Sequence, residues 1–329
     1  MSQQAALPLK IALATYGHTA ALKEGGVAIQ GVTPDFIEVK PIIAAFRRMV
    51  RDVEFDVCEM APATYMIARA AGAPFKALPV FIFRRFHHAG LVCRDDAGIS
   101  KPKDLEGKKV GVRAYSVTTG IWTRGILANE YGLDTSKVTW VVDDEEHVTS
   151  LRLPPNVVHA PPGRSLVDMM AAGELQAAFT DNAGIGRAGA PKEGWQASGQ
   201  SRATTYRELF EDASRLEQEW FQRTGIYPVH GLIVVKDKLL ADHPWLAKSL
   251  FEAFSDSKQR YLQRLKAGDS VSDKDDHYRR MAVIAGDPLP YGVKANLPAI
   301  EALITYSFQQ GLLAQRFPVD AMFVDPEAA

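Results

Sequence analysis

Residues 55–72, FDVCEMAPATYMIARAAG, contain a short strand pattern followed directly by a helix pattern. The apolar run FDVCEM (55–60) predicts a buried strand, and APATYMIARAAG (61–72) predicts a helix that starts near Pro62 and ends at Gly72. A strand joined at once to a helix is the repeating unit of α/β proteins, whose parallel strands are connected through helices. We therefore expect an α/β fold.

The same alternation extends outward from this unit. Further strands are predicted at 9–14, 36–40, 75–83, 108–112, 137–143, 175–181 and 229–237. Further helices are predicted at 42–52, 118–132, 165–174 and 243–265. Because the strands fall into two series of comparable size, we expect two lobes, each a mixed, mainly parallel sheet flanked by helices.

The order of the two series predicts where the lobes begin and end. Lobe 1 is expected to consist of residues 1–92 and 232–329 and lobe 2 of residues 93–231, with hinge strands near 89–96 and 229–237. Ligands of open α/β sheets bind outside the carboxyl ends of strands, so an interlobe cleft is expected. Residues just after strands are therefore the candidates for function.

The overall composition favours a small-molecule partner. The 329 residues carry 38 Lys and Arg against 39 Asp and Glu, a net charge of −1, which gives no general attraction to nucleic acid or to an anionic membrane. The sequence contains no apolar run of about 18 residues, and its first residues lack the features of a secretion signal. We expect a cytoplasmic protein, and a homo-oligomer is compatible with the sequence.

Two strand ends in the first lobe carry candidate chemistry. Tyr16 and His18 follow the first strand at a turn into a helix, where N–H groups can face an anion and Gly17 would let a ligand approach the backbone. His18 is either a site residue or an exposed loop residue. Glu59, at the end of strand 55–60, either caps the next helix or faces the cleft as an acid–base group.

The densest group of side chains suited to ligand binding or proton transfer is RRFHH (84–88), which lies between two apolar strands. Arginine matches the geometry of a carboxylate, and histidine has the ordinary pKa closest to neutrality, which suits proton transfer. A solvated turn is the alternative. Because adjacent residues cannot all face one way, we expect one arginine and one histidine to point inward. The candidates are Arg84, Phe86, His87 and His88.

The second lobe offers hydroxyl groups and an arginine before a predicted helix. Hydroxyls next to the free N–H groups of a helix start bind carboxylate or phosphate, although helix capping explains part of this pattern. An acidic residue ends a later strand, and a histidine lies where the chain returns to the first lobe. The candidates are Arg113, Tyr115, Ser116, Thr118, Thr119, Asp181 and His230.

No metal or organic cofactor is expected. The acidic run 143–147 is interpreted as a solvated helix start, and the spacings H-E-x-x-H and C-x-x-C do not occur, although remote ligands such as Glu59, His88 and Asp181 leave a metal open. The P-loop motif G-x-x-x-x-G-K-[ST] is missing, and the alanine- and glycine-rich stretch 183–189 is interpreted as a flexible loop, so no nucleotide is expected.

Three longer stretches make the chain similar to a known family. Residues 55–70, 79–127 and 165–179 resemble the 4,5-dihydroxyphthalate decarboxylase family, and the similarity extends over residues 9–260. The resemblance implies the fold of type II periplasmic binding proteins. It also implies the activity of a cytoplasmic, cofactor-free carboxy-lyase that serves phthalate degradation and aromatic catabolism.

Two motifs near the most specific part of the resemblance carry it. Cys58–Met60 stands where the family has Ser-Glu-Met. Arg84, Phe86 and His88 match its Arg-x-Phe-Arg-His-Ser, with His87 where the family commonly has arginine.

A third motif is matched only in part. Tyr115 and Thr118 are retained, but the family's glutamate is missing there, and the first loop at residues 15–19 also differs. Because these departures fall at strand ends facing the expected cleft, they indicate a divergent branch that acts on a related aromatic or enol acid.

The resemblance implies decarboxylation of 4,5-dihydroxyphthalate or a related dihydroxylated aromatic acid by acid–base catalysis in the interlobe cleft. His88 is the favoured proton-transfer residue, with Glu59, His18 and His230 as candidates for a second. The carboxylate anchors are expected to be Arg84, Arg113, Ser116, Thr118 and Thr119. Further substrate contacts are assigned to Tyr16, Phe86, His87, Tyr115 and Asp181.

A non-catalytic function is the alternative. The chain would then be a solute-binding protein of the ABC-transporter type, which binds an aromatic or dicarboxylic acid in the same cleft. Such a receptor needs anchors for its ligand and no proton-transfer groups.

Overall fold

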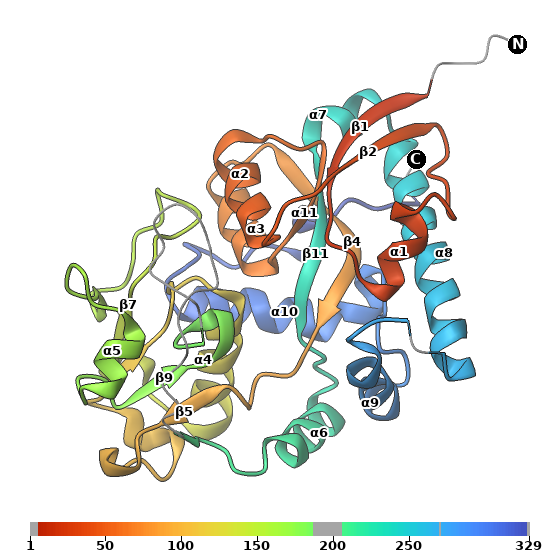
Figure 1. Ribbon diagram of the computed structural model, residues 1–329. Coiled ribbons are helices and arrows are strands. Elements are labelled where there is room, and N and C mark those ends of the chain that lie inside the picture. The colour runs from red at the N-terminus through yellow and green to blue at the C-terminus, as the bar shows by residue number, and fades with distance from the viewer. Residues whose placement is uncertain (1–5, 187–205, 270, 328–329) are drawn as a thin grey trace, which may run out of the picture. The chain divides into compact units, whose positions relative to one another are not determined.

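The computed structural model describes residues 6–186, 206–269 and 271–327 (Figure 1). In it the chain forms two compact units, each with its own sheet. The first unit consists of Met1–Arg85, Val229–Glu301 and Phe317–Ala329, and the second of Phe86–Pro228 and Ala302–Arg316.

The sheet of the first unit has the strand order β2-β1-β3-β11-β4. These strands are β1 (Leu7–Ala12), β2 (Val32–Ile37), β3 (Val57–Met60), β4 (Phe75–Arg84) and β11 (Val229–Lys236). Strands β2, β1 and β3 are parallel, whereas β11 runs antiparallel to both β3 and β4. The sheet is therefore mixed, and within it β11 alone runs against the other described strands.

The helices of the first unit follow from local sequence. They are α1 (Gly17–Lys23), α2 (Ile43–Asp52), α3 (Pro62–Ala70), α7 (Asp237–Asp242), α8 (Leu246–Ala267), α9 (Asp275–Ala285) and α11 (Val319–Met322). Helix α3 begins with Pro62 in its first turn and ends before Gly72, which has a φ of 88°. The strand–helix unit predicted at 55–72 is thus present as β3 and α3.

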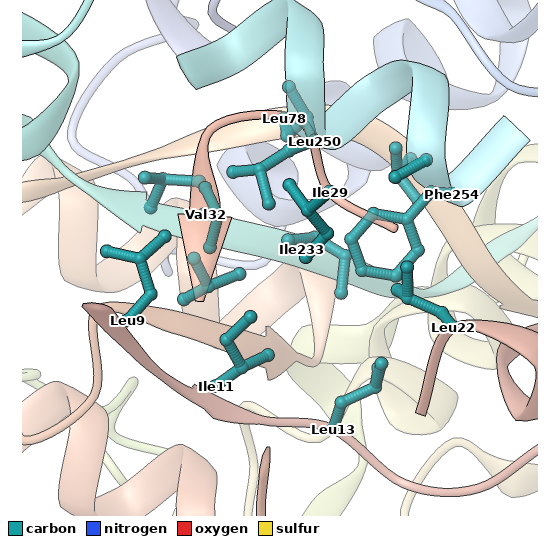
Figure 2. Close-up of a cluster of buried hydrophobic side chains, with 14 of the residues drawn as sticks. Leu9, Ile11, Leu13, Leu22, Ile29, Val32, Leu78, Ile233, Leu250 and Phe254 are labelled. Atoms are coloured by element: carbon teal, nitrogen blue, oxygen red, sulfur yellow. The ribbon is translucent and has the colours of Figure 1, made fainter. Parts of the chain in front are cut away.

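An apolar core between α8 and the sheet stabilises the first unit (Figure 2). Leu250 and Phe254 of α8 pack in the same buried cluster as Ile11 of β1, Leu78 of β4 and Ile233 of β11. All five side chains are at most 1% exposed. Strands from distant parts of the sequence are thereby held at fixed positions, with the carboxyl ends of β1 and β4 at one edge of the sheet and that of the antiparallel β11 at the other.

The second unit has the strand order β10-β5-β9-β6-β7-β8. These strands are β5 (Leu91–Cys93), β6 (Lys109–Gly111), β7 (Thr139–Val142), β8 (Val157–His159), β9 (Ala177–Phe179) and β10 (Arg207–Glu208). Strands β9, β6, β7 and β8 are parallel, and β5 is antiparallel to its neighbours β9 and β10. Both sheets are therefore mixed. In each sheet, one of the described strands runs antiparallel to all the others.

Among the described residues of this unit, the sheet is accompanied by the α-helices α4 (Thr118–Tyr131), α5 (Leu166–Ala171) and α6 (Ala213–Thr224). Short 3₁₀ turns lie at Asp95–Ala97, Pro102–Leu105, Thr135–Lys137 and Asp181–Ala183. The long C-terminal helix α10 (Val293–Gln309) contributes residues to both units. None of the described helices combines the length and apolar character that a membrane crossing requires.

The unit boundaries differ from those predicted. The chain leaves the first unit after Arg85 and returns at Val229, whereas the prediction placed these points at 92/93 and 231/232. The predicted hinge strands are internal strands: β5 pairs within the second sheet, and β11 lies between β3 and β4. Residues 302–316 also belong to the second unit, because the distal part of α10 packs there, with Tyr306 against Trp122.

Two element predictions need correction. Strand β2 covers residues 32–37 rather than 36–40; it is an edge strand, which tolerates Pro34 because one side of such a strand needs no ladder hydrogen bond. The helix predicted at 243–265 is α8, which starts at Leu246 and is preceded by the separate helix α7. The loop predicted at 183–189 lies partly outside the described residues.

Removing side-chain volume from the first core should destabilise the protein strongly. We expect Leu250→Ala to lower the free energy of unfolding by about 2–5 kcal/mol, because it removes buried methyl groups and leaves a cavity. Urea denaturation followed by circular dichroism measures this change. Val283→Ala is the control, since that side chain is 85% exposed and should cost less than about 0.5 kcal/mol. Equal effects of both substitutions would contradict the core described above.

Candidate active site

A buried carboxyl group ends the third strand of the first unit. Glu59 is 3% exposed, and its two oxygens accept hydrogen bonds from the Tyr16 hydroxyl at 2.7 Å and the Ala14 backbone N–H at 3.1 Å. Burial raises the pKa of Glu59 to about 7, and the two hydrogen bonds oppose this only in part. Glu59 therefore holds and releases a proton near neutral pH. Its carboxyl makes no cap on α3, whose N-terminal cap residue is Ala61.

The turn from β1 into α1 carries Tyr16 and His18. Tyr16 is half-buried, and burial together with the nearby Glu59 raises its pKa well above the ordinary value, so the phenol keeps its proton. Gly17 is required here, because a Cβ atom would collide with the ring of Tyr261. The space that was predicted to admit a ligand at Gly17 is thus filled by a side chain of α8.

His18 is fully buried, which excludes the exposed-loop alternative. Its ring stacks on Tyr16 at 5.3 Å and meets the edge of Tyr278 at 5.6 Å and the ring of Tyr261 at 5.9 Å. Burial lowers the pKa of His18 to about 3, with the Ile82 carbonyl opposing that shift. His18 is therefore a neutral imidazole at physiological pH.

Arg84 and Phe83 end strand β4. Arg84 is 1% exposed, donates to the Pro290 carbonyl at 3.3 Å and lies over the Phe81 ring at 5.4 Å. The ring of Phe83 is in contact with three other rings, and its partners are Tyr16 at 6.4 Å, His277 at 6.2 Å and His230 at 5.5 Å. Desolvation, followed by the charge of Arg85, lowers the pKa of His230 well below its ordinary value.

In the second unit, Phe86, His87 and His88 are buried among aromatic rings. Phe86 and His88 both pack against Trp220, at 6.4 and 5.5 Å, and His87 stacks on Trp122 at 6.2 Å. Burial lowers the pKa of His88 to about 4. The prediction that only one histidine of this segment points inward is wrong, because His87 and His88 contact different aromatic side chains on different elements.

The predicted anion site before α4 holds a carboxylate of the protein itself. Glu146 accepts hydrogen bonds from the backbone N–H of Tyr115 at 2.7 Å, from that of Ser116 at 3.3 Å, and from the Ser116 hydroxyl. Arg113 pairs with Asp144 at 3.4 Å, and both side chains are buried. The interpretation of residues 143–147 as a solvated helix start is therefore wrong, since this run folds back onto the loop before α4.

The remaining candidates of the second unit lie at element starts. Thr118 and Thr119 open α4 and are 3% and 7% exposed. Asp181 is exposed and opens a 3₁₀ turn with a φ of 48°, the left-handed region that aspartate tolerates better than most residues. Within the described part of the chain, no three histidine, cysteine or carboxylate side chains come together as a metal site would require.

Comparison with known proteins identifies relatives of this chain. The family model described as NMT1/THI5 like matches residues 46–152. The 4,5-dihydroxyphthalate decarboxylase of Comamonas testosteroni is 32% identical over 333 residues, which covers 96% of this chain and 96% of that protein. The protein of the same name from Pseudomonas putida is 38% identical over 179 residues, covering 52% of this chain and 69% of that protein.

The chain belongs to the 4,5-dihydroxyphthalate decarboxylase family. The resemblance noted from the motifs at 55–60 and 84–89 is thus confirmed over nearly the whole sequence. Among solved structures, the periplasmic aliphatic sulphonate binding protein SsuA of Escherichia coli matches with a TM-score of 0.54 and 12% identity, over 98% of this chain and 93% of that protein. The fold of this family member is that of type II periplasmic binding proteins.

Several functional candidates in this decarboxylase-family chain carry no sequence signature. Tyr261, His277 and Tyr278 lie on α8 and α9, more than 200 residues after Tyr16, yet their rings surround His18 and Phe83. Their spacing on the helices is that of ordinary core residues. Arg124 is also buried, lying 3.9 Å over the Tyr115 ring, and is indistinguishable in sequence from an exposed helix residue.

The raised pKa of Glu59 has a measurable consequence for stability. Between its ordinary pKa of 4.5 and about 7, the folded protein binds a proton that the unfolded chain has released, so the free energy of unfolding falls as pH rises through this range. The loss attributable to Glu59 is about 3.5 kcal/mol at most, from about 1.4 kcal/mol for each pH unit between 4.5 and about 7.

Urea denaturation at pH 5 and pH 8 tests this expectation. Wild-type protein should lose about 2.5 kcal/mol more stability between the two pH values than Glu59→Gln, whose side chain does not titrate. Glu24→Gln, at an exposed position, is the control and should behave like wild type. Identical pH dependence in wild type and Glu59→Gln would mean that Glu59 has an ordinary pKa.

Proposed function

We propose that the chain is a decarboxylase of 4,5-dihydroxyphthalate or a closely related dihydroxylated aromatic acid, and that it uses acid–base groups of its own. Membership of the family supports the reaction class. The main evidence from this chain itself is the pair formed by Glu59 and Tyr16. The buried carboxyl of Glu59 has a pKa of about 7 and accepts a hydrogen bond from the hydroxyl of Tyr16, a half-buried residue. A protein that only binds its ligand has no need of such a group.

The chemistry requires two proton transfers. The ring carbon that bears the departing carboxylate must receive a proton, and a base must draw the proton from the hydroxyl para to it. The C–C bond to the carboxylate then breaks, its electron pair restores the aromatic ring, and CO₂ leaves. Each acid or base contributes about 10²–10⁴-fold in rate, most effectively when its pKa lies near the working pH.

Glu59 and Tyr16 meet the requirement for the proton donor. Near pH 7 a substantial fraction of Glu59 is protonated, whereas the usual carboxylic acid is fully ionised there. Its hydrogen bond to the Tyr16 hydroxyl provides a path through which a proton passes to a ligand that reaches Tyr16, a residue that is partly exposed. In this proposal Tyr16 gives its proton to the ring carbon and takes one from Glu59.

The three histidines first considered are less suited to donate a proton. His18 and His88 have pKa values near 3 and 4, and that of His230 is well below ordinary, in each case chiefly because the ring is desolvated. Their imidazolium forms are scarce at neutral pH, so the role of acid passes from His88 to Glu59. Arg84 stays the proposed carboxylate anchor of the first unit, and the roles of Thr118 and Thr119 in the second unit stay predictions. Ser116 is occupied by Glu146, which a substrate carboxylate would have to replace.

The direct test is whether purified protein releases CO₂ from 4,5-dihydroxyphthalate. We expect turnover with this acid or with another dihydroxylated member of a panel of aromatic carboxylic acids, followed by CO₂ production and by ultraviolet absorbance. Tight binding across the panel without CO₂ release would overturn the proposal and identify a solute-binding protein instead.

Substitution of the proposed proton donor should affect turnover more than binding. We expect Glu59→Gln and Tyr16→Phe to lower kcat by about 10²-fold or more, with KM changed only modestly, because each substitution interrupts the proton path but keeps the shape of the side chain. Glu24→Gln is the matched control and should leave both parameters unchanged. A kcat within about twofold of wild type for both site variants would remove Glu59 from the mechanism.

A further inference from the structure

His277, in the first turn of α9, belongs to the same aromatic cluster as the proposed proton donor. Its ring stacks on Phe83 at 6.2 Å with an angle of 24° between the planes, and Phe83 in turn stacks on Tyr16 at 6.4 Å. The edge of Tyr278 lies 5.2 Å from the His277 ring. His277 and His230 both contact the Phe83 ring, so each is a candidate for the base that the reaction needs in addition to its proton donor.

One hydrogen bond defines the tautomer of His277. Its Nε2 lies 2.8 Å from the backbone carbonyl oxygen of Arg84. A carbonyl oxygen only accepts hydrogen bonds, so Nε2 must carry the hydrogen, and in the neutral ring Nδ1 then presents a lone pair. A histidine held in this way by a backbone carbonyl is oriented as well as restricted to one tautomer.

Nδ1 of His277 is left available for a ligand. The bond to Arg84 is the only hydrogen bond that the ring makes with the described residues, and Nδ1 is not among the polar atoms sealed from solvent. The side chain as a whole is half-buried. His18 and His230 differ on this point, because each has ring nitrogen that is buried away from solvent.

The charges around His277 favour its neutral form and an anionic ligand. Burial is the largest cause that lowers the pKa of His277; the nearby cations Arg280, Lys274 and Arg85 lower it further, and only the Arg84 carbonyl opposes them. The other titratable rings of the cluster include His230, Tyr16 and Tyr278, and the pKa of His230 is lowered well below its ordinary value. Asp275 and Asp276 share the first turn of α9 with His277; Asp275 accepts from Tyr261 and Ser272, and Asp276 pairs with Arg279. Arg85 and Arg280 are the cations that an aromatic dicarboxylate would meet beside this base.

We propose that His277 is the general base of the decarboxylation, which takes the proton of the substrate hydroxyl para to the departing carboxylate through Nδ1. This inference rests on the proposed function. The O–H bond breaks as the Nδ1–H bond forms, while Tyr16 and Glu59 supply the proton to the ring carbon. After CO₂ leaves, His277 returns its proton to the phenolate oxygen, and Glu59 regains a proton from water, so that one proton is consumed for each CO₂ released.

The two groups together give a bell-shaped pH dependence. Activity falls toward acid pH as His277 takes up a proton and can no longer act as a base. It falls toward alkaline pH, above about 7, as Glu59 ionises and can no longer donate. The acidic limb therefore belongs to His277 and the alkaline limb to Glu59.

His277→Gln separates the base from a purely structural role. The glutamine side-chain N–H₂ can still donate to the Arg84 carbonyl, but the amide oxygen, although it accepts hydrogen bonds, is too weak a base to replace Nδ1. We expect kcat to fall by about 10²–10⁴-fold, KM to stay within about threefold, and the acidic limb of the pH profile to disappear. His243→Gln is the matched control, because this histidine packs on Trp245 outside the cluster, and it should behave like wild type.

Two further measurements secure the interpretation. Added imidazole should restore part of the activity of His277→Ala, which a merely structural loss would not allow. Nitrogen-15 spectra of histidine in the wild-type protein should show His277 with its hydrogen on Nε2 at neutral pH. If wild type releases no CO₂ from any acid of the panel, the proposed function fails. If wild type is active, then unchanged kcat in His277→Gln, or a hydrogen on Nδ1, overturns the role of His277 alone.

Discussion

The carboxyl group of Glu59 lies in a strand whose four residues are all buried, and water has almost no access to it. Burying a carboxylate is costly, so the group is stabilised in its protonated form unless neighbours compensate. Here two hydrogen bonds, from Tyr16 and Ala14, and the charge of Lys23 do so in part, and both hydrogen bonds come from the chain that leaves the adjacent strand β1. The position of Tyr16, the packing of its ring on Phe83 and the arrangement of the rings around it all depend on this contact.

The fold explains why such a group can exist at the end of β3. Parallel pairing of β3 with β1 brings the segments after both strands to one edge of the sheet, and the core between α8 and that sheet holds the strands in register. The solved structure of SsuA from Escherichia coli shares this fold, and ligands of open α/β sheets bind outside the carboxyl ends of strands. A binding site becomes a site for proton transfer when one of the ligand contacts is a carboxyl group that is neither exposed nor fully paired.

Local sequence patterns were sufficient for much of the fold. The strand–helix unit at 55–72 was predicted because its period, its Pro62 and its Gly72 are local signals. The strand-end rule pointed to Glu59 and Tyr16, whose side chains are hydrogen-bonded at 2.7 Å. The boundaries of the units were less well predicted, since they depend on where distant segments such as 302–316 pack. The expected cleft between two lobes stays a prediction.

The parts of the site that were not predicted depend on contacts between residues that lie far apart in the sequence. Ser116 looked like an anchor for an external anion because no sequence pattern shows that Glu146, 30 residues later, folds back to occupy it. His277 has the appearance of an ordinary helix residue, and its importance follows only from the Arg84 carbonyl and the Phe83 ring beside it. Likewise, His88 suggested a proton-transfer residue in sequence, but its burial beside Trp220 lowers its pKa to about 4.

The mechanism depends on Glu59 being partly protonated near neutral pH. A carbon-13 titration of the glutamate side-chain carboxyl groups, with Glu59→Gln used to assign the resonance, measures this directly. A midpoint near pH 7 for Glu59 is the expected result. A midpoint near its ordinary value of 4.5 would contradict the claim, because the carboxyl would then be ionised and unable to supply a proton at neutral pH.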